Sequence, residues 1–196
     1  MKLFKLVLII FLSSFLNTIS LAKDPQELIT SIVNEASLIL KSSDPVESKI
    51  IKLNDIAERN VDINGIGMYA LGKHKKSMSE DEKIKYNKLF KSYFLKSFSS
   101  RLVDYTDPKI NVVSQKKINT KYTIVTSILE ATSKTPEVRI DWRIYTKNPD
   151  KPLIRDLIVE GLSLARTQKE EFNSVIQNNN GDLNALFKTL EEFLIK

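Results

Sequence analysis

The spacing of apolar residues along the chain changes twice. Up to about residue 105 they recur every three or four positions, which is typical of helices that bury one face. Residues 109–164 alternate between apolar and polar side chains, as half-buried strands do, and the remainder returns to helical spacing. The pattern therefore predicts helices first, strands next and helices last.

Short polar motifs mark where several helices begin. Asp24-Pro25 places an N-cap residue before a proline in the first helical turn, and Asp182 is an N-cap for the last helix. Ser79-x-x-Glu82 is a capping box at the start of the longest predicted helix. Between them, Gly65 and Gly67 interrupt a short helix, and we expect them to permit close approach of another backbone.

The alternating region predicts four strands joined by short polar breaks. Their predicted ranges are Lys109–Ile118, Lys121–Ala131, Glu137–Thr146 and Pro152–Leu164. Connections this short join neighbouring strands in an antiparallel order. The sequence thus predicts an α+β domain in which helices cover one face of a curved four-stranded antiparallel sheet.

The N-terminus has the pattern of a secretory signal peptide. Lys2 and Lys5 precede an apolar run too short to span a bilayer, and the small residues Ser20 and Ala22 fit a cleavage site. We expect residues 1–22 to be removed and residues 23–196 to form one exported domain. Removal would lower the formal charge from +6 to +4, and the absence of cysteine excludes disulfides and a lipidated cysteine anchor.

The sequence offers little catalytic chemistry. His74 is the single histidine and has only lysines beside it, and no phosphate loop, dinucleotide fingerprint or zinc spacing is present. We therefore expect no cofactor and no metal. Aromatic residues among the lysines of the long helix have core spacing, so nucleic acid is not an expected partner. Asp141 and Asp156 on the strands keep an enzyme alternative open.

One face of the predicted sheet is strongly apolar. Alternation places Val138, Ile140, Trp142 and Ile144 on one side of the third strand, with Leu157 and Val159 on the fourth. This face opposes a helix rich in Phe and Tyr, so the two surfaces either pack together or leave a hydrophobic cavity. Periodicity alone does not distinguish these two arrangements.

Several segments resemble the MlaC family of periplasmic phospholipid-binding proteins. They are "GMYALGKH", the helix "SEDEKIKYNKLFKSYF", the strand "VRIDWRI" and the run "DLIVEGLSL". The resemblance covers nearly all of the chain after the signal peptide and implies an NTF2-like fold that encloses acyl tails. It also implies a shuttle that carries glycerophospholipid between an outer-membrane lipoprotein-porin complex and an inner-membrane ABC transporter with an MCE-domain subunit, and so maintains outer-membrane lipid asymmetry.

The resemblance further implies which residues line the lipid cavity: Met68, Leu71, Phe90, Phe94, Phe98, Val138, Ile140, Trp142, Ile144, Leu157 and Val159. Each of them is equally compatible with an ordinary packed core. His74 and Lys75 depart from the family pattern, which has an aromatic pair at this point. Two other functions stay open, namely a small-molecule isomerase or hydrolase of the same fold and a membrane-associated adaptor with a solid core.

Overall fold

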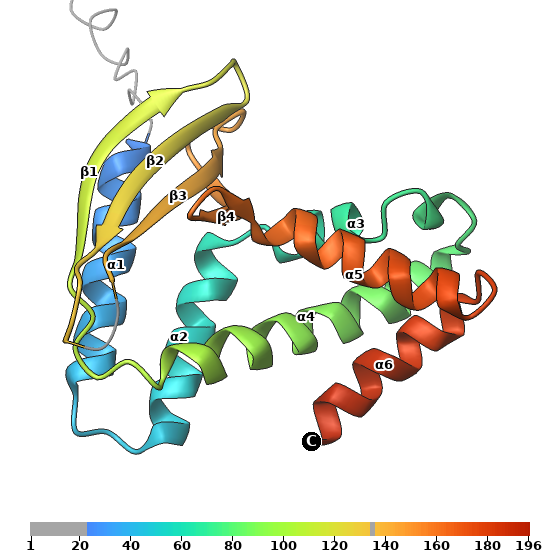
Figure 1. The fold of residues 1–196 in the computed structure, drawn as a ribbon. Coiled ribbons are helices and arrows are strands. Elements are labelled where there is room, and N and C mark those ends of the chain that lie inside the picture. Colours follow the sequence, from blue (N-terminus) through green and yellow to red (C-terminus); the bar gives the residue numbers. More distant parts are fainter. Residues whose placement is uncertain (1–22, 134–135) are drawn as a thin grey trace, which may run out of the picture.

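The computed structural model describes residues 23–133 and 136–196. The predicted signal peptide, residues 1–22, lies outside the described residues. Within them, helices and strands follow the predicted order (Figure 1). The helices are α1 (Pro25–Lys41), α2 (Val46–Asn60), α3 (Ile63–Ala70), α4 (Glu80–Leu102), α5 (Leu164–Asn178) and α6 (Leu183–Ile195), with a short 3₁₀ turn at His74–Lys76.

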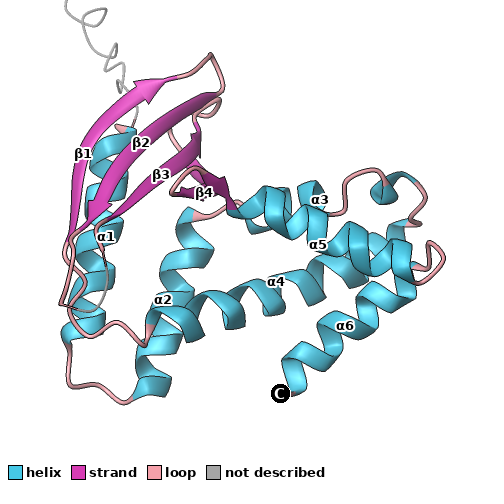
Figure 2. Ribbon diagram, viewed as in Figure 1, coloured by secondary structure: helices cyan, strands magenta, loops and turns pink. Residues whose placement is uncertain are grey.

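The strands form one antiparallel sheet in sequence order. They are β1 (Ile110–Lys117), β2 (Tyr122–Leu129), β3 (Val138–Tyr145), β4 (Leu153–Val159) and β5 (Leu162–Ser163). Figure 2 shows the sheet curving beside the helices, so the predicted α+β architecture is confirmed.

The prediction of four strands is wrong by one, because the segment Pro152–Leu164 contains a turn. Glu160 and Gly161 both have positive φ, 49° and 80°, which is the backbone of a two-residue hairpin loop. The loop folds Leu162–Ser163 back onto Ile158 and Val159 as β5. The predicted fourth strand is therefore β4 and β5 together.

The predicted helix starts are confirmed in detail. The Asp24 side chain accepts hydrogen bonds from the backbone N–H groups of Gln26 and Glu27, and Ser79 and Glu82 make both bonds of the capping box. Asp182 caps α6 by accepting from the N–H of Asn184. These short contacts fix where α1, α4 and α6 begin and hence which faces they bury.

Gly67 permits a close approach, although its neighbour is a side chain and not the backbone expected from the sequence. A Cβ atom at this position would lie 2.6 Å from the ring of Phe90 on α4. The hydroxyl of Tyr86 also donates a hydrogen bond to the Gly67 carbonyl, at 2.9 Å. The glycine thus lets α4 pack directly on the backbone of α3.

The buried side chains form two clusters. One joins α1 to the inner face of the sheet, through residues such as Ile29, Val33, Val125 and Ile144. The other, which we call the helical core, joins α3, α4, α5 and α6, and its aromatic members include Tyr86, Phe90, Phe172 and Phe187. Helix α4 begins in the helical core, and its C-terminal end lies beside α2 (Figure 1).

Candidate functional site

A cavity of about 430 Å³ lies between the two clusters. Its walls come from α1, α2, α4, α5 and the inner face of the sheet, and most lining side chains are apolar. Its volume falls within the range of about 300 to 1,000 Å³ that small-molecule sites occupy. The apolar sheet face and the aromatic helix stripe therefore do not pack together along their whole length, in contrast to the solid core of the adaptor alternative.

Helix α4 supplies an aromatic wall. Phe94 and Phe98 are four residues apart, so they lie on the same helix face. Their rings are stacked with centroids 6.0 Å apart and planes 8° from parallel. Phe90, one turn earlier, reaches the same cavity while most of its ring is held in the helical core.

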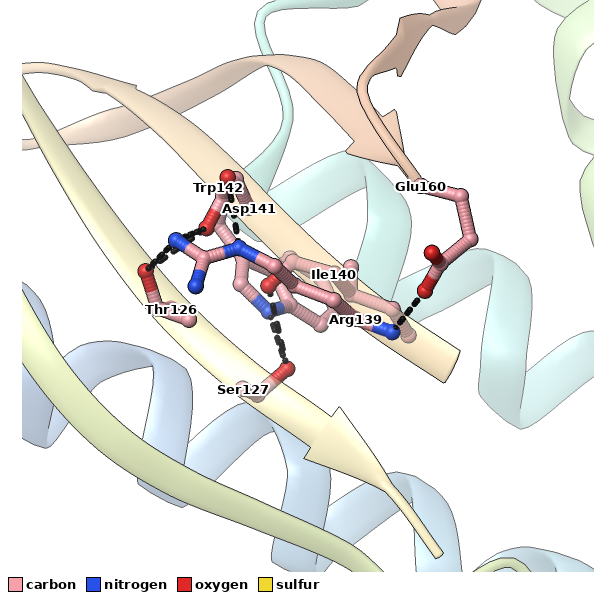
Figure 3. A network of polar contacts seen from close by, with 7 residues as sticks. All are labelled: Thr126, Ser127, Arg139, Ile140, Asp141, Trp142 and Glu160. Carbon is pink, nitrogen blue, oxygen red and sulfur yellow. Dashed lines mark hydrogen bonds and ion pairs between the residues drawn. The ribbon is translucent and has the colours of Figure 1, made fainter. Parts of the chain in front are cut away.

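The sheet supplies the opposite wall through paired residues. Trp142 pairs with Leu157 across β3 and β4, and Ile140 pairs with Val159, so all four side chains share the inner face. The indole N–H of Trp142 donates a hydrogen bond to Ser127 Oγ at 2.8 Å (Figure 3). Because this bond satisfies the one polar group of the indole, the ring can present an apolar surface to the cavity.

Helices α1 and α2 contribute lining residues that were not predicted from the sequence to line a cavity: Ile32, Val33, Ala36, Leu40, Leu53, Ile56 and Ala57. Their helical spacing predicts that they are buried. The spacing does not show whether these side chains face other side chains or a cavity. A cavity wall and a packed interface therefore have the same sequence pattern here.

Seven of the eleven predicted lining residues do face the cavity: Phe90, Phe94, Phe98, Ile140, Trp142, Leu157 and Val159. The structure places the other four, Met68, Leu71, Val138 and Ile144, outside the lining. Leu71 and Met68 pack in the helical core, and Ile144 is buried in the cluster beneath α1. That any of these residues touches a ligand stays a prediction.

The carboxylates that kept an enzyme alternative open have structural partners. Asp156 accepts hydrogen bonds from Ser163 Oγ at 2.6 Å and from the Ala165 N–H at 3.0 Å, and it lies 3.2 Å from the Arg143 guanidinium. It therefore fixes the start of α5 to the sheet.

Asp141 precedes Trp142 on β3, so it lies on the other face of the sheet, and it is not among the residues that line the cavity. Its contacts are drawn in Figure 3. It accepts hydrogen bonds from Thr126 Oγ1 at 2.6 Å and from the guanidinium of Arg139. Glu160, in the loop between β4 and β5, accepts a hydrogen bond from the backbone N–H of Arg139. The three carboxylates do not converge on a common site.

His74 also has a structural contact. Its Nε2 atom lies 3.0 Å from Asn173 Oδ1, which links the turn after α3 to α5. In the part of the chain that the structure describes, no group of three or more His, Cys, Asp or Glu side chains is arranged to hold a metal ion. The described helices also include none with the length and apolar character required to cross a bilayer.

Comparison with solved structures identifies a close match in fold. The phospholipid-binding protein from Ralstonia solanacearum, solved in complex with a phospholipid, superposes with a TM-score of 0.72. The two sequences are 19% identical, and the match covers 88% of this chain and 98% of the other. At this identity the likeness establishes a shared fold.

Comparison of sequences identifies the family. A search of curated proteins finds no significant match to this chain. The sequence profile described as MlaC protein, however, matches residues 27–192, which is nearly all of the domain that follows the predicted signal peptide. The chain therefore belongs to the MlaC family.

Proposed function

We propose that this chain is a periplasmic phospholipid carrier. In this proposal, the acyl tails of the bound phospholipid occupy the cavity between the sheet and α4, and the headgroup of the lipid lies at the cavity opening. The observation that carries the proposal is an apolar cavity of about 430 Å³ in a member of the MlaC family. The phospholipid bound to the Ralstonia solanacearum protein of the same fold supports it.

The apolar lining residues explain why binding of acyl chains in the cavity would be favourable. Phe94, Phe98 and Trp142 present rings to the cavity, and transfer of an acyl chain from water to such a surface is favourable by ~0.8 kcal/mol per methylene group. A bound lipid with two such chains would leave unaided only very slowly. A carrier of this kind therefore has to release its lipid to a docked partner.

The partners included in this proposal are those that membership of the MlaC family suggests. In the proposed cycle the signal peptide directs the chain to the periplasm, where it exchanges lipid with an outer-membrane lipoprotein-porin complex and an inner-membrane ABC transporter that has an MCE-domain subunit. This exchange maintains outer-membrane lipid asymmetry. The cycle includes no reaction and no cofactor, and the bonds of Asp141 and Asp156 assign those carboxylates to holding the fold.

A vesicle assay tests the carrier function. Purified chain is mixed with donor vesicles that contain a fluorescent phospholipid and with unlabelled acceptor vesicles, and we expect transfer to rise in proportion to protein concentration. Val159→Asp places a carboxylate in the cavity wall and should abolish transfer, because a buried charge without a partner is costly and its hydration excludes an acyl chain.

The matched control is Val113→Asp. Val113 is also a strand valine, but it lies on the edge strand β1 and is 53% exposed. We expect this variant to transfer lipid as the unmodified chain does. Equal transfer by the unmodified chain and by Val159→Asp, with both folded by circular dichroism, would contradict the proposed cavity. Transfer no faster than without protein would contradict the carrier function.

A further inference from the structure

Four lysines gather where the turn after α3 meets α5. Three of them belong to the 3₁₀ turn or directly precede it, and the fourth is on α5. The contact of His74 with Asn173 holds the turn against α5, and the α5 lysine is one helical turn before Asn173 on the same face. We call the four residues the lysine cluster: Lys73, Lys75, Lys76 and Lys169.

Contacts with the chain around α3 hold Lys169 in place. Its ammonium group lies 5.4 Å from the centroid of the Tyr69 ring, within the reach of a cation–π interaction. Gly72 has a φ of +56°, and a Cβ atom built there would lie 3.0 Å from Lys169 Cε. The lysine stem therefore passes close to the bare backbone of Gly72, and this brings its charge beside the turn that carries the other three lysines.

The charges of the cluster are not neutralised by the part of the chain that the structure describes. No carboxylate there forms an ion pair with any of the four lysines. Of the three acids in the first turn of α4, two have other partners, because Glu80 pairs with Lys83 and Glu82 accepts hydrogen bonds from Ser79. On α5, Glu170 lies about 100° around the helix axis from the lysine that precedes it.

The composition of the cluster suits a bilayer surface better than a protein surface. It contains no arginine, whose planar guanidinium matches carboxylates held in a fixed geometry, whereas lysine has a compact charge on a flexible stem. Such charges can follow anionic headgroups, which have no fixed positions in a fluid leaflet. Tyr69, which is 45% exposed beside the cluster, adds a ring with an apolar body and a polar hydroxyl, and membrane interfaces favour this combination.

We propose that the lysine cluster docks the chain onto a bilayer leaflet that contains anionic phospholipid. The ammonium groups contact headgroup phosphates, and the Tyr69 ring lies at the level of the headgroups. The inference goes beyond lipid carriage, because it concerns the outer surface of the chain and holds whatever the cavity contains. Thr167 and Gln168 directly precede Lys169 on α5 and line the cavity, so one helix joins the docking surface to the cavity wall.

Vesicle flotation tests the docking. Purified mature chain is mixed with vesicles of phosphatidylcholine alone or of phosphatidylcholine with phosphatidylglycerol, and the protein that floats with each kind of vesicle is quantified. Each lysine near an anionic surface strengthens binding by roughly fivefold, so we expect flotation with the mixed vesicles and not with phosphatidylcholine alone. Flotation should be lost at about 1 M salt, where the screening length falls to about 3 Å.

Two double variants with the same change in net charge separate the cluster from the general charge of the chain. Lys73→Gln with Lys76→Gln removes two exposed members and should weaken binding to the mixed vesicles by roughly 25-fold. The control is Lys116→Gln with Lys117→Gln on β1, which lies at the opposite end of the molecule from the turn after α3 (Figure 1). These two charges lie farther from the docked bilayer than the screening length, so the control should bind as the unmodified chain does.

Three results would overturn the docking surface. One is an unmodified chain that does not float with the mixed vesicles, which would assign the cluster to an acidic protein or to solvent. Another is equal flotation with both kinds of vesicle. The third is equal binding by the two double variants, with both folded by circular dichroism, because general charge would then account for the attraction. None of these results bears on the cavity, whose role is measured separately by lipid transfer with Val159→Asp.

Discussion

The two halves of α4 have the same kind of sequence and opposite surroundings. In the first half, Tyr86 and Phe90 are 0% and 2% exposed and pack among the aromatic rings of the helical core. In the second half, Phe94 and Phe98 are only partly buried and line the cavity. One aromatic stripe thus belongs to a filled core at one end and to a cavity wall at the other.

The difference arises from what faces each half. Around Tyr86 and Phe90, α4 packs closely on α3 and α6, and Gly67 lets the Phe90 ring lie directly against the α3 backbone. The second half faces α1, α2 and a curved sheet, whose side chains do not reach far enough to fill the space. The function proposed for the chain depends on this incomplete packing, because a filled core has no room for an acyl tail.

The largest effect should come from truncating one phenylalanine in each region. Phe187→Ala removes a ring that is 3% exposed from the helical core and should lower the free energy of unfolding by about 3–5 kcal/mol. Phe98→Ala should cost less than half as much, because its ring already borders an open space. Urea unfolding of lipid-free protein measures both, and equal losses would show that the two halves are packed alike.

A smaller effect should follow from enlarging one alanine in each region. Ala70→Leu overpacks the helical core, where Ala70 is 1% exposed, and should lower the free energy of unfolding by about 1–3 kcal/mol. Ala36→Leu extends into the cavity and should cost under about 1 kcal/mol while reducing the amount of lipid bound. A loss of stability in Ala36→Leu as large as in Ala70→Leu would contradict an open cavity beside α1.

The smallest effect should come from removing one hydroxyl in each half of α4. Tyr86→Phe deletes the bond to the Gly67 carbonyl in a fully buried site and should lower the free energy of unfolding by about 1 kcal/mol. Tyr93→Phe deletes the bond to Gln168 in a partly exposed part of the cavity wall, where water can replace the lost partner, so it should cost less. Thermal unfolding of both variants compares them, and a greater loss of stability in Tyr93→Phe would contradict the looser packing of α4 at the cavity.

Local signals made the helix starts and the sheet predictable from the sequence. Asp24 and the Ser79–Glu82 capping box make hydrogen bonds to groups no more than three residues away. Their sequence patterns therefore specify the helix starts directly. The β4–β5 turn was missed because such loops favour Asn-Gly or Asp-Gly, and Glu160 at positive φ gives no such signal. The fold class was therefore accessible, while one strand boundary was not.

The candidate site was predictable only in part, because a cavity depends on elements that are distant in the sequence. Alternation correctly placed Trp142 and Val159 on one face, yet Ile144 on that same face lies beneath α1 and not at the cavity.

Extraction of the purified mature chain with organic solvent, followed by mass spectrometry and phosphorus analysis, tests the central claim most directly. The account predicts phospholipid in a nearly equimolar amount with the protein, because an apolar cavity shields acyl tails from water once the carrier has left a membrane. Folded protein that yields no phospholipid after expression in a bacterial host would contradict it, and would mean that the open half of α4 is not a lipid-binding surface.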